Sequence, residues 1–102
     1  WGANNSVHQY SGNGISLPFP ETFADEYHVF SIDWQENQIT WLLDDVEFFT
    51  INSSQMNGKA YPFNEDFFFI LNVAVGGNWP GYPDESTLFP VYMAIDYVRV
   101  FQ

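Results

Sequence analysis

The pattern of apolar and polar positions along the chain predicts short β-strands and no long helix. The longest apolar run extends from Phe67 to Val75 and is interrupted only by Asn72. Its residues are mostly aromatic or β-branched, and Gly76-Gly77 follows it directly. A run of this length would also suit a buried helix, but these residue types and the closing glycines favour a central strand buried on both faces.

Alternation of apolar and polar residues predicts further strands on either side of that run. In chain order, the expected strands are 15–19, 27–34, 39–43, 46–51, 67–75 and 93–101. Asp44-Asp45 separates two of them as a hairpin turn, and Asp45 lies where such a turn calls for a positive φ. Because glycine is favoured at the second position, we expect a backbone cost at Asp45.

These elements predict an all-β fold, an antiparallel β-sandwich or jelly roll. The polar connection 52–64 is long enough for a short helical turn, and 82–90 is expected to be a loop. No segment has a helical period over three turns, and the sequence contains no internal repeat or linker. At 102 residues the chain is predicted to form one domain at most.

Charge narrows the range of partners. Lys59 and Arg99 are the only basic residues against thirteen acids, which gives a net charge of −11. Nucleic acid is therefore excluded as a partner, because phosphate contacts need lysine and arginine, and an anionic membrane surface is disfavoured. The chain has no cysteine, and its longest apolar run is far too short for a membrane span. Neutral ligands, cationic ligands and metal ions remain.

Asn72 and Trp79 are the residues whose types suggest binding chemistry. An amide in a buried strand must find hydrogen-bond partners, either in neighbouring backbone or in a ligand that occupies a cleft. Trp79 stands between Gly77 and Pro80 in the loop after the same strand. An amide that bonds hydroxyls and an indole that stacks on C–H faces together suit a sugar. The alternative is a core asparagine and a tryptophan packed under its own loop.

Several motifs resemble glycoside hydrolase family 16, and in particular its laminarinase-like endo-β-1,3-glucanases. The motifs are Phe67–Gly81 with Asp84–Thr87, Ala94–Val100, and His28–Trp34 followed by Ile39–Asp44, with the opening Trp1-Gly2. The resemblance covers nearly the whole chain in the family's order. It implies the C-terminal half of a concanavalin-like jelly roll, secretion from the cell, and retaining hydrolysis of internal β-1,3 or β-1,3-1,4 glucan linkages.

One departure from the family concerns catalysis. The signature Glu-x-Asp-x-(x)-Glu, which supplies the acid/base and the nucleophile, is absent from the sequence. The acids occur mostly as adjacent pairs, whose side chains would point to opposite faces of a strand. Asp45 and Glu47 could share a face, but they flank a hairpin turn, where solvation is the better interpretation. We therefore expect the catalytic strand to lie upstream of Trp1; a non-catalytic, lectin-like glucan-binding module is the alternative.

The resemblance also implies roles for particular residues. Asn72 would face the substrate on the concave sheet, and Trp79 and Trp1 would stack on sugar. Asp96 would help hold a structural calcium ion together with oxygens from the N-terminal part of the domain, because calcium takes about six to eight oxygen ligands. The partner would be β-glucan, and the missing half or a second copy would cover the exposed sheet edges. Trp34 and Trp41 are expected to pack in the core.

Overall fold

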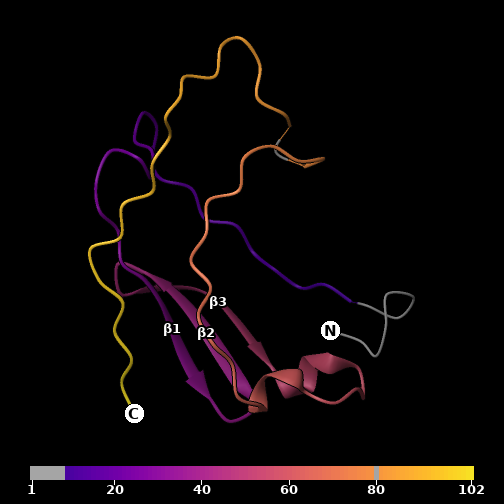
Figure 1. The fold of residues 1–102 in the computed structure, drawn as a ribbon. Helices are drawn as coiled ribbons and strands as arrows, with labels where there is room; N and C mark the ends of the chain where they lie inside the picture. The colour runs from indigo at the N-terminus through magenta and orange to yellow at the C-terminus, as the bar shows by residue number, and fades with distance from the viewer. Residues whose placement is uncertain (1–8, 80) are drawn as a thin grey trace. The chain divides into compact units, whose positions relative to one another are not determined.

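The computed structural model describes residues 9–79 and 81–102 (Figure 1). The chain divides into two compact units, Trp1–Phe67 and Phe68–Gln102, which are treated separately below. All regular secondary structure in the described residues belongs to the first unit. Over the same residues, no helix has the length and apolar character needed to cross a membrane.

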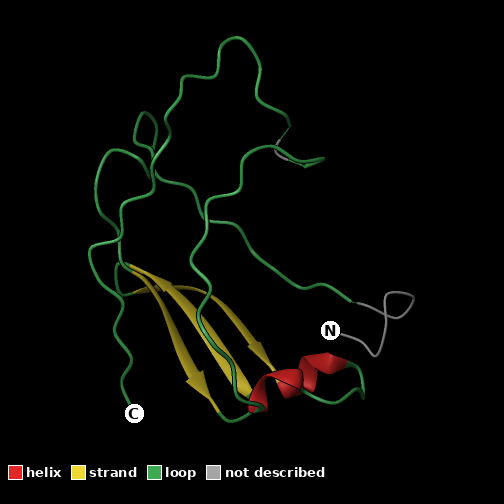
Figure 2. Ribbon diagram, viewed as in Figure 1, coloured by secondary structure: helices red, strands yellow, loops and turns green. Residues whose placement is uncertain are grey.

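An antiparallel sheet of three strands forms the centre of the first unit (Figure 2). The strands are β1 (Phe30–Gln35), β2 (Gln38–Leu43) and β3 (Val46–Asn52), and they pair in sequence order. Two short 3-10 helices follow, η1 (Ser53–Met56) and η2 (Pro62–Asn64). The predicted all-β class, the hairpin at Asp44-Asp45 and the helical turn in 52–64 are thus confirmed.

Turn chemistry explains why the two hairpins form where they do. The β2–β3 turn consists of Asp44, with φ 48°, and Asp45, with φ 67°. Both lie in the left-handed region, and the positive φ predicted at Asp45 is confirmed. Asn37, with φ 63°, also takes a left-handed conformation, in the turn between β1 and β2. Asparagine and aspartate tolerate this conformation better than other non-glycine residues, so the sequence specifies both turns locally.

Asp44 also ties the turn to the segment that precedes β1. Its carboxylate accepts hydrogen bonds from the Val29 amide and from His28 Nδ1, both at 2.8 Å. The Asp44 amide in turn donates to the Val29 carbonyl at 2.9 Å. The hydrogen bond from His28, and after it the one from Val29, lowers the pKa of Asp44. Asp44 thus stabilises the hairpin as a carboxylate, and this contribution is lost as the pH falls through its lowered pKa.

A capping box sets the start of η1. The Asn52 side-chain oxygen accepts from the Ser54 amide at 3.1 Å, and the Gln55 side-chain oxygen accepts from the Asn52 amide at 2.7 Å. Two backbone donors at the helix start are therefore satisfied. The helix then places Met56, the residue that closes it, against the sheet.

Three apolar residues from β2, β3 and η1 form the core of the first unit: Ile39, Ile51 and Met56. Met56 is fully buried, and Ile39 lies directly opposite Ile51 in the sheet. The partly buried side chains that surround these three are Trp41, Phe49, Tyr61 and Phe63. The prediction that Trp41 packs in the core is confirmed, since it also contacts Phe49 at a ring-centroid distance of 5.1 Å.

Trp34 was also expected in the core, but 43% of its surface is exposed. It lies in β1 at the edge of the three-stranded sheet. Its indole N–H donates to the Phe63 carbonyl at 2.7 Å, and its ring meets that of Phe67 edge-on at 5.6 Å. The prediction that Trp34 packs in the core is therefore wrong for the described residues, in which it is only partly covered.

The predicted strands 15–19, 67–75 and 93–101 are wrong as strands, because none of these segments is paired in the described structure. The run 67–75 is extended and exposed, with 83% of Phe68 and 72% of Ile70 accessible. Apolar sequence predicts burial, whereas a strand exists only when a neighbour supplies hydrogen bonds. In 27–52 that neighbour follows within a few residues; for 67–75 and 93–101 the described residues offer none.

Candidate functional site

The loop 76–83 in the second unit presents the best candidate for ligand binding. Asn78 and Trp79 form the turn at its tip. Trp79 is 99% exposed, so its indole packs against no described side chain to a significant extent. The sequence left two interpretations of Trp79: a ring that packs under its own loop, or a ring available to a ligand. In the structure the ring faces outward.

Glycines allow the backbone path of this loop. Gly76, Gly77 and Gly81 have φ values of 75°, 140° and 83°. Residues with a β-carbon rarely adopt these angles, so the glycines at both ends of the loop are required by its conformation. The positive φ values of Gly76 and Gly77 end the extended run 67–75, as the sequence predicted.

Contacts within the loop hold its two ends together. The Tyr82 hydroxyl donates to the Asn78 side-chain oxygen at 3.3 Å. A β-carbon added to Gly76 would lie 3.1 Å from Pro83 Cδ and 3.2 Å from Tyr82 Cδ1. The Tyr82 ring and Pro83 therefore lie against the Gly76 backbone. Sequence reasoning missed Asn78 and Tyr82; the signal available was a polar residue between turn-forming glycines and an aromatic residue directly after the last of them.

A turn immediately after the loop is fixed by Asp84. Its carboxylate accepts from the Ser86 hydroxyl at 2.6 Å and from the Ser86 amide at 2.8 Å. Its amide donates to the Thr87 hydroxyl at 3.1 Å. The hydrogen bond from the Ser86 side chain, followed by that from the Ser86 amide, lowers the pKa of Asp84. Asp84 is thus held as a carboxylate that organises its own backbone.

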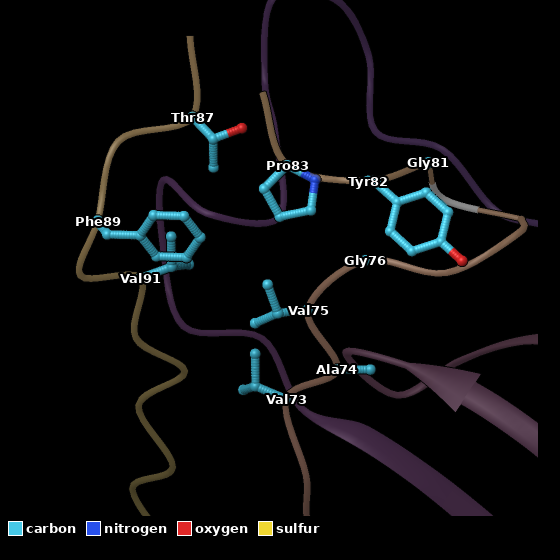
Figure 3. Close-up of a pocket in the computed structure, with 10 residues that line it drawn as sticks. All are labelled: Val73, Ala74, Val75, Gly76, Gly81, Tyr82, Pro83, Thr87, Phe89 and Val91. Atoms are coloured by element: carbon cyan, nitrogen blue, oxygen red, sulfur yellow. The ribbon is translucent and has the colours of Figure 1, made fainter. Parts of the chain in front are cut away.

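An open apolar hollow of about 250 Å³ lies beside the loop (Figure 3). The hollow is lined by residues before and after the Asn78-Trp79 turn. They are Val73, Ala74, Val75, Gly76, Gly81, Tyr82, Pro83, Thr87, Phe89 and Val91. Figure 3 shows the side chains of Val73, Val75, Thr87 and Phe89 directed into it, whereas Ala74 points away. It contains no titratable group suited to acid or base catalysis.

Of the other two predicted substrate contacts, Asn72 is described by the structure and Trp1 is not. Asn72 is exposed, so the premise of a buried amide that must find a partner is wrong in this structure. It precedes Gly76, the first residue of the loop, by four positions in the sequence. Trp1 lies outside the described residues, and its predicted stacking stays a prediction.

Asp96 does not form a calcium site with the described residues alone. It is exposed, and in residues 9–79 and 81–102 no group of three or more histidine or acidic side chains gathers around one point. One carboxylate supplies at most two of the roughly six to eight oxygens that calcium takes. The calcium ion therefore stays a proposal that depends on oxygens from elsewhere.

Asp45 and Glu47 lie where the sequence placed them, on either side of the β2–β3 turn. Asp45 is the second turn residue, and Glu47 is the second residue of β3; both are exposed. Their exposure gives no sign of the enclosed environment in which a catalytic carboxylate pair works. The chemistry that the described site offers is stacking and hydrogen bonding, without an acid/base pair.

Comparison with known proteins identifies a family and several relatives that the chain resembles. The profile of glycosyl hydrolases family 16 matches residues 3–99. A glucan endo-1,3-beta-glucosidase A1 from Niallia circulans is 38% identical over the whole chain, which covers 16% of that protein. A beta-glucanase from Rhodothermus marinus is 30% identical over 97% of the chain and 36% of its own length.

A beta-1,3-glucan-binding protein from Penaeus monodon is 32% identical over 74% of the chain and 24% of its own length. The chain thus spans about a third or less of the length of each of these three relatives. Because the family profile matches almost the entire sequence, the chain belongs to glycosyl hydrolases family 16.

Proposed function

We propose that this chain is the glucan-contacting part of a glycoside hydrolase that cleaves internal β-1,3 or β-1,3-1,4 glucan linkages with retention. The single observation that carries the proposal is Trp79, whose indole is 99% exposed at the tip of a glycine-flanked turn. An apolar ring left in water is unfavourable, and a flat apolar surface that covers it restores the lost free energy. The C–H face of a glucose unit is such a surface.

Asn72 is a second residue proposed to contact glucan. The Asn72 amide can donate to and accept from sugar hydroxyls, and its exposure leaves both groups accessible. Trp1 would add a second stacking ring at the other end of the chain. The net charge of −11 suits this neutral ligand, since a neutral polysaccharide is not repelled by it.

Catalysis in this proposal uses carboxylates that this chain does not contain. Retaining hydrolysis needs a nucleophile and an acid/base about 5–5.5 Å apart. The chain's contribution is to bind the glucan and orient it with respect to that pair. Binding energy from such remote contacts lowers the barrier when it is used to position the scissile bond. Secretion and a calcium ion held partly by Asp96 belong to the same proposal.

A second candidate is a family member that recognises β-glucan without cleaving it. The observation that favours it is the similarity to a protein named as a beta-1,3-glucan-binding protein. The strand upstream of Trp1 discriminates between the two. Two glutamates there would make the protein a hydrolase, and their replacement would make it a binding protein.

A reducing-end assay with laminarin tests the proposal on the full-length protein. Release of reducing ends supports hydrolysis, and binding of laminarin without release supports the second candidate. Neither binding nor release would contradict both. The 102-residue chain alone, run in parallel with size-exclusion chromatography, is expected to release nothing above a no-protein blank. Turnover that survives repurification would identify Asp45 and Glu47 as the first acids to mutate.

A further inference from the structure

We infer that Tyr82, together with Asn78 and Gly76, positions Trp79 for its ligand by bracing the loop 76–83 from inside. This inference rests on the proposed function, because it assumes that Trp79 contacts glucan. Tyr82 is a positioning residue in this scheme: it acts on the sugar only through the loop that it holds.

The need for a brace follows from the exposure of Trp79. A buried tryptophan is oriented by its neighbours, but a side chain that is 99% exposed takes its direction from its own backbone. Three glycines with positive φ lie in the same loop, and glycine gives the backbone more freedom than any other residue. Without an internal restraint, binding would require this loop to be ordered first, which weakens affinity.

The Tyr82 ring supplies the main part of this restraint. It lies against Gly76 closely enough that a β-carbon there would be 3.2 Å from Tyr82 Cδ1 and 3.1 Å from Pro83 Cδ. The first and last residues of the loop thus lie so close together that a β-carbon at position 76 would force Tyr82 or Pro83 to shift. Figure 3 shows Tyr82 and Pro83 next to the Gly76 backbone at the edge of the hollow.

The Tyr82 hydroxyl adds a weaker restraint at the tip. It donates to Asn78 Oδ1 at 3.3 Å, and Asn78 is the residue directly before Trp79. This distance is at the long end for two oxygens, so the hydrogen bond contributes less than the ring contact. Removal of the ring should therefore weaken binding more than removal of the hydroxyl.

The experiment is calorimetric titration of the full-length protein with laminarihexaose for a small set of variants. Tyr82→Ala should weaken binding about tenfold, and Tyr82→Phe about twofold, in keeping with the loss of a ring contact and of one weak hydrogen bond. Asn78→Ala should match Tyr82→Phe, and the double variant Asn78→Ala/Tyr82→Phe should be no weaker than either, because both remove the same bond. Tyr92→Ala, which removes an exposed tyrosine outside the loop, is the control and should leave affinity unchanged.

A pair of glycine variants separates the contact from backbone strain. Gly76→Ala and Gly81→Ala both place a β-carbon at a positive φ in the same loop, 75° and 83°. Only at Gly76 does that carbon meet Tyr82 and Pro83, whereas nothing lies within 4 Å of it at Gly81. Gly76→Ala is therefore expected to weaken binding at least about threefold more than Gly81→Ala.

Indole ¹⁵N–¹H spectra provide a readout that general destabilisation would not reproduce. The Trp79 signal, assigned with Trp79→Phe, should shift or broaden in Tyr82→Ala while the other indole signals stay in place. Trp79→Ala is included in the titrations. If it weakens binding but Tyr82→Ala and Gly76→Ala do not, the bracing role is refuted and the proposed function stands. If Trp79→Ala binds normally, Trp79 is no glucan contact, and both claims about this loop fail.

Discussion

Met56 offers the sharpest test of the core described for the first unit. Its side chain is completely buried and joins the 3-10 helix η1 to Ile39 of β2 and Ile51 of β3. Replacement by alanine removes these contacts and leaves a cavity. Comparable methionine-to-alanine changes in cores cost about 2–5 kcal/mol of the free energy of unfolding.

The lower half of that range applies here. Trp41, Phe49, Tyr61 and Phe63 surround the cluster and are only partly buried, so they can move into part of the vacated volume. We therefore expect Met56→Ala to lower the free energy of unfolding by about 2–3 kcal/mol. Met56→Leu conserves volume and should cost less than about 1.5 kcal/mol.

Native-state hydrogen exchange of β2 and β3 amides in the full-length protein measures this change locally. Val46→Ala is a matched control on the same hairpin, since 64% of Val46 is exposed and its truncation should cost less than about 1 kcal/mol. A loss below about 1 kcal/mol for Met56→Ala, equal to that of the control, would refute the assigned core.

Three further perturbations test other features. Asp45→Gly should raise the free energy of unfolding by up to about 1 kcal/mol, because it relieves a positive φ at the β2–β3 turn; a decrease in a urea melt would contradict this, and Asp45→Asn controls for the lost charge. Tyr61→Phe should leave the free energy of unfolding unchanged or raise it by up to about 1 kcal/mol, because the buried Tyr61 hydroxyl has no hydrogen-bond partner in the described residues. Burial also raises the pKa of this hydroxyl. A loss of more than about 1 kcal/mol in the free energy of unfolding would reveal a partner. Calcium should raise the melting temperature of the full-length protein, and Asp96→Ala should abolish the rise; coincident melts with calcium and with chelator would exclude the site.

The hairpins were predictable because the information that specifies them is local. Alternation in 27–34, 39–43 and 46–51 predicted the strands, and Asp44-Asp45 predicted the turn with a positive φ at Asp45, which the structure confirms. Each strand finds its partner across a two-residue connection, so sequence pattern and hydrogen bonding agree.

The extended segments were not predictable by the same means. The run 67–75 has the composition of a central strand, but composition reports only that a segment suits burial, and pairing depends on residues far away in the chain. The family match nonetheless includes this segment, since it extends over residues 3–99. At the candidate site, sequence pointed to Trp79, whereas the contact of Tyr82 with Gly76 depends on the three-dimensional path of the loop.

The affinity of the full-length protein for laminarin oligosaccharides, with and without the Trp79 indole, tests the account most directly. Trp79→Ala should weaken binding by about 1–3 kcal/mol, the range for covering a side chain of this size, and Trp79→Phe should recover part of the loss because it retains a flat ring. The fold, checked by far-ultraviolet circular dichroism, should not change, since the side chain is 99% exposed. Equal affinity of Trp79→Ala and the unmodified protein, with the fold intact, would contradict the claim that this loop contacts glucan.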